Sequence, residues 1–194
     1  MAGAATAEGR GFWARVGLPR PELRAWALYD WANSGYVTTV IAALFPIYFA
    51  RVAAAGLPGE LSAQRFAVAT SLSMAGVALM APFLGALADR SGRLKGLLGA
   101  FVALGVGSCA GLFFVGPGDW LRGLVLFGLG NVGITGSLVF YDALLRHLAR
   151  DDELDRVSSA GYALGYLGGG VLLALQLAWV QWPARFGFAD AAHA

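Results

Sequence analysis

The sequence predicts an all-α integral membrane protein with five transmembrane helices. Hydrophobic residues make up 58% of its 194 residues and charged residues only 13%, and its mean hydropathy is +0.63. Both values set it apart from soluble domains, of which about half the residues are apolar. A membrane-spanning helix needs about 20 mostly apolar residues. Five windows reach that length, namely residues 25–49, 66–88, 96–115, 121–145 and 158–180.

The positive charges orient these helices. Ten of the fourteen Lys and Arg residues lie before the first window or in the links after the second and the fourth. Cytoplasmic loops of membrane proteins carry an excess of such residues. We therefore expect a multi-pass protein of the cell (inner) membrane, with residues 1–24 as a cytoplasmic tail and residues 181–194 as an external one.

Prolines, an acidic residue and short links refine the helix assignments. We expect Pro19 and Pro21 to keep the chain extended just before the first helix, and Glu22, near its start, suits the positive end of the helix dipole. Pro46 predicts a kink in the outer third of the first helix. The second and third helices are joined by about seven residues, so we expect them to pack as an antiparallel pair. The GPGD turn at 116–119 joins the third and fourth just as tightly.

Small residues recur every four positions in two of the windows. Membrane helices approach one another closely where such residues face a neighbour. The alternative is that this spacing arises by chance, because the chain has 28 glycines. We expect two helix contacts of this kind, one in the third helix and one in the fifth, at Gly99, Ala103, Gly107, Gly111, Gly161, Gly165 and Gly169.

Two carboxylates, Asp30 and Asp142, fall inside the predicted spans at a similar depth from the cytoplasmic side. A charge in hydrocarbon costs at least a few kcal/mol, so we expect them to face a cavity or a partner. Such a pair could bind a proton or a cationic group and couple it to a conformational change. The alternative is that Asp142 reaches the membrane surface near Arg146 and that Asp30 orders local polar groups.

Polar and aromatic residues accompany both carboxylates. On the first helix, Tyr29, Asn33 and Tyr36 are spaced by four and three, which places them on one face. On the fourth helix, the corresponding set is Asn131, Thr135 and Tyr141. Such faces could bind a polar solute, although hydrogen bonds between helices would explain any single one of these residues.

The link GALADRSGRLK, residues 85–95, joins the second and third helices. We expect Gly85 to allow close helix approach, Asp89 to end the helix and Gly92 to form the turn. Its cationic residues would hold the link in the cytoplasm. A charge cluster of this kind can latch one conformation and release in another; an ordinary cytoplasmic loop is the alternative. The basic residues concerned are Arg90, Arg93 and Lys95.

Other classes of function lack sequence support. No zinc-protease, nucleophile-elbow or phosphate-loop motif is present, so we expect no enzyme activity, no metal and no cofactor. The net charge of +2 follows the membrane topology and does not indicate nucleic-acid binding.

Several of these stretches resemble a known family. GALADRSGRLK resembles the loop signature that major facilitator proteins carry between their second and third helices. The segments ALYDWANSGYVTTVIAALFPIYF and LVFYDALLRHLARDDELDRVSSAGYALGYLGGG resemble the autophagy-related vacuolar amino-acid effluxer family. Its bacterial members form a major facilitator family of uncharacterised substrate. The similarity covers about residues 25–180.

The resemblance implies twelve helices in two six-helix halves that give alternating access by rocking. The first and fourth helices would line the central cavity, which would bring Asp30 and Asp142 into one lumen. Asp89 would be the acidic residue of the latch, with the basic residues of the link as its partners. Asp142 and Arg146 depart from the family pattern, which has Asn and Pro there.

By this resemblance the chain holds five helices of the N-terminal six-helix half, and we expect a fragment truncated before the sixth. We expect it to take part in transmembrane transport of a small polar solute, with amino acids suggested by fungal relatives that export them from the vacuole. Its partners would be the lipid bilayer, the solute and the missing C-terminal half or another polypeptide. The alternative is a non-transporting membrane remnant or helix-association subunit.

Overall fold

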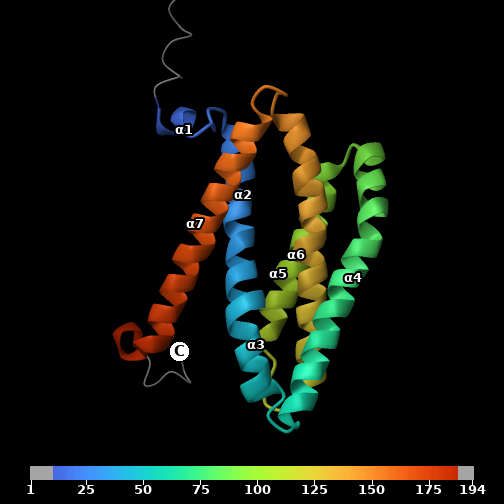
Figure 1. The fold of residues 1–194 in the computed structure, drawn as a ribbon, viewed down its shortest axis with the longest axis vertical. Coiled ribbons are helices and arrows are strands. Elements are labelled where there is room, and N and C mark those ends of the chain that lie inside the picture. Colours follow the sequence, from blue (N-terminus) through green and yellow to red (C-terminus); the bar gives the residue numbers. More distant parts are fainter. Residues whose placement is uncertain (1–10, 188–194) are drawn as a thin grey trace, which may run out of the picture. The chain divides into compact units, whose positions relative to one another are not determined.

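A computed structural model describes residues 11–187, whose regular secondary structure is entirely helical (Figure 1). It confirms the predicted fold class. Five helical segments are long and apolar enough to cross a membrane, namely Pro21–Ala53, Gly59–Arg90, Leu94–Leu112, Trp120–Leu148 and Leu154–Gln181. Residues 1–10 and 188–194 of the two predicted tails lie outside the described part of the chain.

The helices differ in extent from the apolar windows. The second span, α4 (Gly59–Ser91), begins before its window because the polar residues of its first turns also adopt helical geometry. The third, α5 (Leu94–Leu112), ends within its window. The fourth and fifth are α6 (Trp120–Leu148) and α7 (Leu154–Gln181). Hydropathy marks the apolar stretch, whereas backbone hydrogen bonds continue into the flanking polar residues.

The first span changes helix type along its length. It begins as α2 (Pro21–Tyr36), with Glu22 in its first turn as predicted. Pro21, expected in the extended chain before the helix, is instead its first residue, because the first helical position needs no backbone N–H. A π-helix, η2 (Val37–Leu44), follows, then α3 (Phe45–Tyr48) and a second π-helix, η3 (Phe49–Ala53). Pro46 lies between the two π-helices. Because its ring clashes with the carbonyl four residues earlier in an α-helix, a wider helix accommodates it.

The chain divides into two compact units. The first comprises residues 11–43 and 152–187 of the described chain, and the second comprises residues 44–151. Each unit has its own packed helices.

In the first unit, α2 and α7 pack side by side and run in the same direction. A Cβ on Gly161 would lie 2.5 Å from Trp26 Cζ3, and one on Gly169 would lie 3.0 Å from Thr38 Cγ2. Residue numbers thus rise together along both helices, as topology requires of the first and fifth spans. The unit also contains the short helices α1 (Phe12–Arg15) and η4 (Pro183–Phe186).

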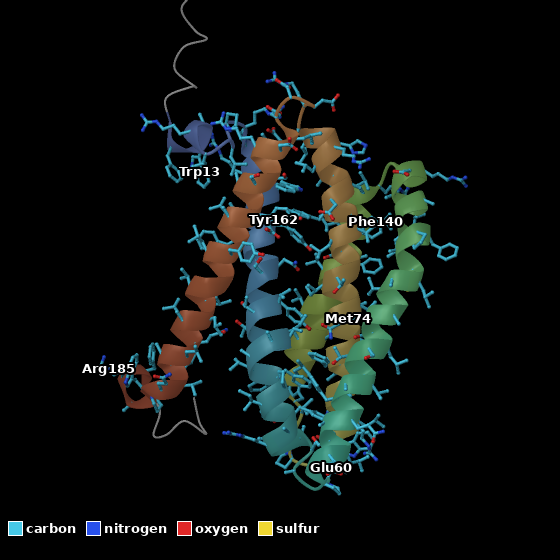
Figure 2. The ribbon with its side chains drawn as sticks, viewed as in Figure 1. Trp13, Glu60, Met74, Phe140, Tyr162 and Arg185 are labelled. Carbon is cyan, nitrogen blue, oxygen red and sulfur yellow. The ribbon has the colours of Figure 1, made fainter. Side chains whose placement is uncertain are left out.

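In the second unit, α6 packs against α5 and α4 and against the end of the first span. Four aromatic rings form one core, in which Phe45 stacks on Phe127 with ring centroids 4.6 Å apart and Phe49 and Phe66 complete the cluster. A second core contains Phe140, whose ring centroid is 5.5 Å from that of Phe101. Figure 2 shows Phe140 toward the end of this unit that is remote from Glu60.

The closest helix approach in the second unit corrects the prediction for the third helix. A Cβ on Gly133 would lie 2.5 Å from the backbone nitrogen of Gly105, so α5 and α6 touch backbone to backbone there. Gly111 meets Leu126 of α6, but a Cβ on Gly99 or Gly107 would meet nothing within 4 Å. The contact face is therefore rotated from the predicted stripe, because α5 presents Gly105 to α6.

The link between α4 and α5 differs from prediction in two respects. The helix continues past Asp89 to Ser91, and Gly92 ends it in the left-handed conformation with φ +58°. Gly92 therefore makes the turn as expected. Gly85 has no neighbour within 4 Å of a Cβ position, so no close approach occurs there among the described residues. The charged residues of this link are exposed to solvent, namely Asp89, Arg90, Arg93 and Lys95.

Candidate functional site

The predicted site residues divide between the two units. The first unit holds those of α2, and the second holds those of α6. The α2 set is Tyr29, Asp30, Asn33 and Tyr36, and the α6 set is Asn131, Thr135, Tyr141 and Asp142.

Asp30 lies at the contact between α2 and α7. Its Oδ2 atom and the Oγ atom of Ser34 both lie less than 3.0 Å from the position that a Cβ on Gly165 would take. The carboxylate is therefore directed at the glycine face of α7, and only a residue without a side chain leaves room for it. Asp30 itself is half-buried.

The same contact continues for one more turn through a hydroxyl group. Thr38 Oγ1 donates to the Ser34 carbonyl at 2.9 Å, and the Gly169 carbonyl of α7 lies 3.3 Å from the same atom. The carbonyls of a glycine-lined helix are accessible to polar side chains of its neighbour because no Cβ shields them. A polar strip on α2 thus rests on the glycine strip of α7.

Asn33, also on α2, has a buried amide oxygen. The residue is 7% exposed, and Oδ1 has no hydrogen-bond partner among residues 11–187. Tyr29 and Tyr36 are half-buried on the same helix. The spacing of four and three residues places all three on one side of α2, as the sequence indicates.

Asn131 on α6 is a buried polar residue of the second unit. It is 2% exposed, and within the described chain neither Oδ1 nor Nδ2 has a hydrogen-bond partner. It follows Phe127 by one helical turn, so it lies on the face of α6 that stacks against Phe45 of α3. A buried amide with neither atom paired costs about 1–3 kcal/mol for each group.

The other predicted residues of α6 lie in less enclosed positions or close to its C-terminal end. Thr135, one turn after Asn131, is half-buried, and Tyr141 is 5% exposed. Asp142 and Arg146 are both exposed.

The start of the first unit contains a charged cluster that the sequence did not predict. Arg156 of α7 donates to the carbonyls of Ala14 and Arg15 at 3.0 and 2.7 Å. These carbonyls belong to the end of α1, where a cation suits the helix dipole. Arg20 forms an ion pair with Glu153. Together these contacts attach the segment before α2 to the start of α7.

Sequence reasoning also missed Ser34 and Thr38. A signal for them exists, because Trp26, Asp30, Ser34 and Thr38 recur every four residues, the same period as the glycines of α7. Two strips of equal period can lie along one another for several turns.

Comparison with known proteins finds one matching family and one similar protein. It matches the vacuole effluxer Atg22-like family over residues 58–185. It is 35% identical over 155 residues to the uncharacterized MFS-type transporter YxiO of Bacillus subtilis (strain 168), an alignment that covers 79% of this chain and 36% of that protein. The chain thus spans little more than a third of this relative. No solved structure matches it.

Proposed function

Because the chain belongs to the vacuole effluxer Atg22-like family, we propose that it forms part of an alternating-access transporter for a small polar solute. The observation that supports this most is the buried, unpartnered amide of Asn131 among the described residues of the second unit. Folding leaves such groups unpaired only rarely, and those that persist call for a partner such as water or a ligand.

Amino acids are the substrate class that we propose. A free amino acid carries a carboxylate and an ammonium group, and an amide side chain can donate to the first through Nδ2 and accept from the second through Oδ1. In the first unit, the unpaired Oδ1 of Asn33 on α2 is an acceptor of the same kind. Aromatic residues beside these amides would enclose the rest of the solute.

Proton coupling through Asp30 and Asp142 completes the proposed mechanism. The half-buried carboxylate of Asp30 faces the glycine strip of α7, where protonation would remove the cost of a charge in an apolar span. Asp142, near the cytoplasmic end of α6, would exchange protons with water. Changes in the protonation of either residue would alter the preference for one conformation over the other.

We further propose that the transporter needs a second set of helices, supplied either by another polypeptide or by a longer polypeptide that includes this chain. Substrate sites of two-half transporters lie between the halves, and this chain spans only 36% of its relative. We propose the cell membrane as its location, with the N-terminus in the cytoplasm and the C-terminus outside, as the positive charges predict.

Proteoliposome transport tests the proposal. The chain, alone or co-expressed with the remaining helices of a family member, is assayed for uptake of a labelled amino-acid mixture driven by a pH gradient. We expect uptake only with the partner. Uptake by the chain alone would refute the need for a second set of helices, and absence of uptake in both samples would contradict amino-acid transport.

Two substitutions test the residues. Asn131→Leu retains the approximate volume of the side chain but removes both polar atoms, so we expect uptake to fall while the protein stays folded. Ser137→Ala is the matched control, because Ser137 is also buried on α6 but its Oγ donates to the Ile134 carbonyl at 2.5 Å. Proton flux that is unchanged in an Asp30→Asn, Asp142→Asn double variant would eliminate the coupling role.

A further inference from the structure

A groove of about 680 Å³ runs between α4 and α6 in the second unit. Val68 and Leu72 of α4 line one wall, and Leu121, Val125 and Leu129 of α6 line the other. All five side chains are at least 42% exposed. The groove is therefore an apolar surface that the helices of this unit leave open.

The groove opens on the side of α6 remote from its aromatic contact with α3. Phe127 points to Phe45, whereas Val125 and Leu129 are each two residues away from Phe127 along the helix. Two residues of an α-helix correspond to a rotation of about 200°. Val125 and Leu129 thus face away from α3.

A cationic residue stands at one end of the groove. The Arg65 guanidinium carbon lies 3.8 Å from the ring centroid of Trp120. Stacking uses the flat face of the guanidinium, so its N–H groups point outward from the edge of the pair. Within residues 11–187 no carboxylate forms an ion pair with Arg65. Its edge can therefore bind an oxyanion.

The dimensions of the groove match one leaflet of a bilayer. Its lining on α6 runs from Trp120 to Val132, a distance of about 18 Å at about 1.5 Å per residue. Half of the hydrocarbon core of a bilayer is about 15 Å thick. Trp120 begins α6, and Trp and Arg residues commonly mark the interface between membrane and water. The groove thus extends from the interface to about the bilayer midplane.

We propose that this groove binds one anionic phospholipid, with an acyl chain along α4 and α6 and the phosphate at the edge of Arg65. An apolar trough one leaflet long with a cation at its mouth is complementary to such an amphiphile. A zwitterionic lipid would fill the trough equally well but would gain less at Arg65, since its own ammonium offsets the phosphate charge. The inference does not depend on what the protein transports.

Native mass spectrometry of the purified full chain tests this site. The chain is incubated with equal amounts of phosphatidylglycerol and phosphatidylcholine that have identical acyl chains. We expect one phosphatidylglycerol molecule to be retained in preference to phosphatidylcholine. Arg65→Gln should reduce that preference about fivefold, because one arginine increases the affinity for an anionic membrane surface by about that factor. Equal retention of the two lipids by the unmodified chain would overturn the proposal without any variant.

Matched substitutions separate the groove from general lipid contact. Arg122→Gln removes a charge from the same end of α6 outside the groove lining, so it should leave the preference unchanged. Val125→Trp should fill the trough and abolish retention, whereas Val106→Trp, at an exposed position of α5, should not. Equal effects of the two arginine variants would overturn the site. So would displacement of the lipid by co-expressed partner helices, because the groove would then be a helix-docking surface.

Discussion

Asp30 and Gly165 restrict each other's identity: the Oδ2 atom of Asp30 occupies the space that any side chain at Gly165 would need. The acidic residue is thus part of the contact between the first and fifth spans. Motion of α7 relative to α2 would change the surroundings of the Asp30 carboxylate. Conversely, protonation of this carboxylate would alter the packing between α2 and α7. This relationship supports the proposal that Asp30 is a coupling residue.

Gly165→Ala should weaken the contact between α2 and α7. The added methyl group would collide with Asp30 and Ser34, and overpacking of this kind costs about 1–3 kcal/mol. The free energy of unfolding is measured by titrating the purified chain with SDS and monitoring the loss of helix by circular dichroism. Gly170→Ala is the control on the same helix, where a Cβ would meet nothing within 4 Å. Equal stability of both variants would contradict the packing described for Gly165.

Gly133→Ala should destabilise the second unit more than Gly99→Ala. A methyl group on Gly133 would press on the backbone of Gly105 and on the Phe101 carbonyl, neither of which can rotate away. A loss of about 3 kcal/mol is expected, at the upper end for overpacked sites. Gly99 has open space around it. Thermal unfolding of the two variants in the same detergent provides the comparison. A less stable Gly99→Ala variant would favour the contact face that the glycine spacing predicts.

Phe127→Ala should remove the centre of the aromatic core. The side chain is fully buried and contacts the rings of Phe45 and Phe66, and truncation of a buried Phe costs about 3–5 kcal/mol. Phe83→Ala serves as the control because Phe83 is 77% exposed on α4. The measurement is the yield of monodisperse protein and its unfolding free energy. Similar values for both variants would show that the cluster contributes little.

Arg156→Ala should release the segment that precedes α2. The guanidinium bonds to the Ala14 and Arg15 carbonyls would be lost, and each exposed bond contributes about 1 kcal/mol. We expect amide hydrogen exchange at residues 14–18 to accelerate about fivefold or more, as followed by mass spectrometry. Arg146→Ala removes an exposed arginine from the end of α6 and should leave this exchange rate unchanged.

The positions of the helices were predictable because hydropathy and length are local properties. Glu22 predicted the start of the first span, and Gly92 predicted the turn after the second. The π-helices around Pro46 were less predictable. A proline signals a disturbance, but whether the backbone kinks or widens depends on the packing around it.

Glycine contacts show a second limit. The strip at Gly161, Gly165 and Gly169 lies against α2, whereas Gly99 and Gly107 have no close neighbour and Gly105 makes the contact instead. Both stripes have the same four-residue period in the sequence. The period alone cannot distinguish a contact face from a lipid face, because lipid accepts small residues as readily as another helix does.

The sequence by itself determined the membrane class, the five helical segments and the resemblance to a transporter family, because each follows from composition, window length or a local motif. Only the tertiary structure decided that Asp30 faces Gly165, that Asn131 is buried with its amide unpaired within the described chain, and that Arg65 stacks on Trp120. These relationships join residues distant in sequence. They depend on the rotation of each helix about its axis, which packing between helices sets and hydropathy does not record.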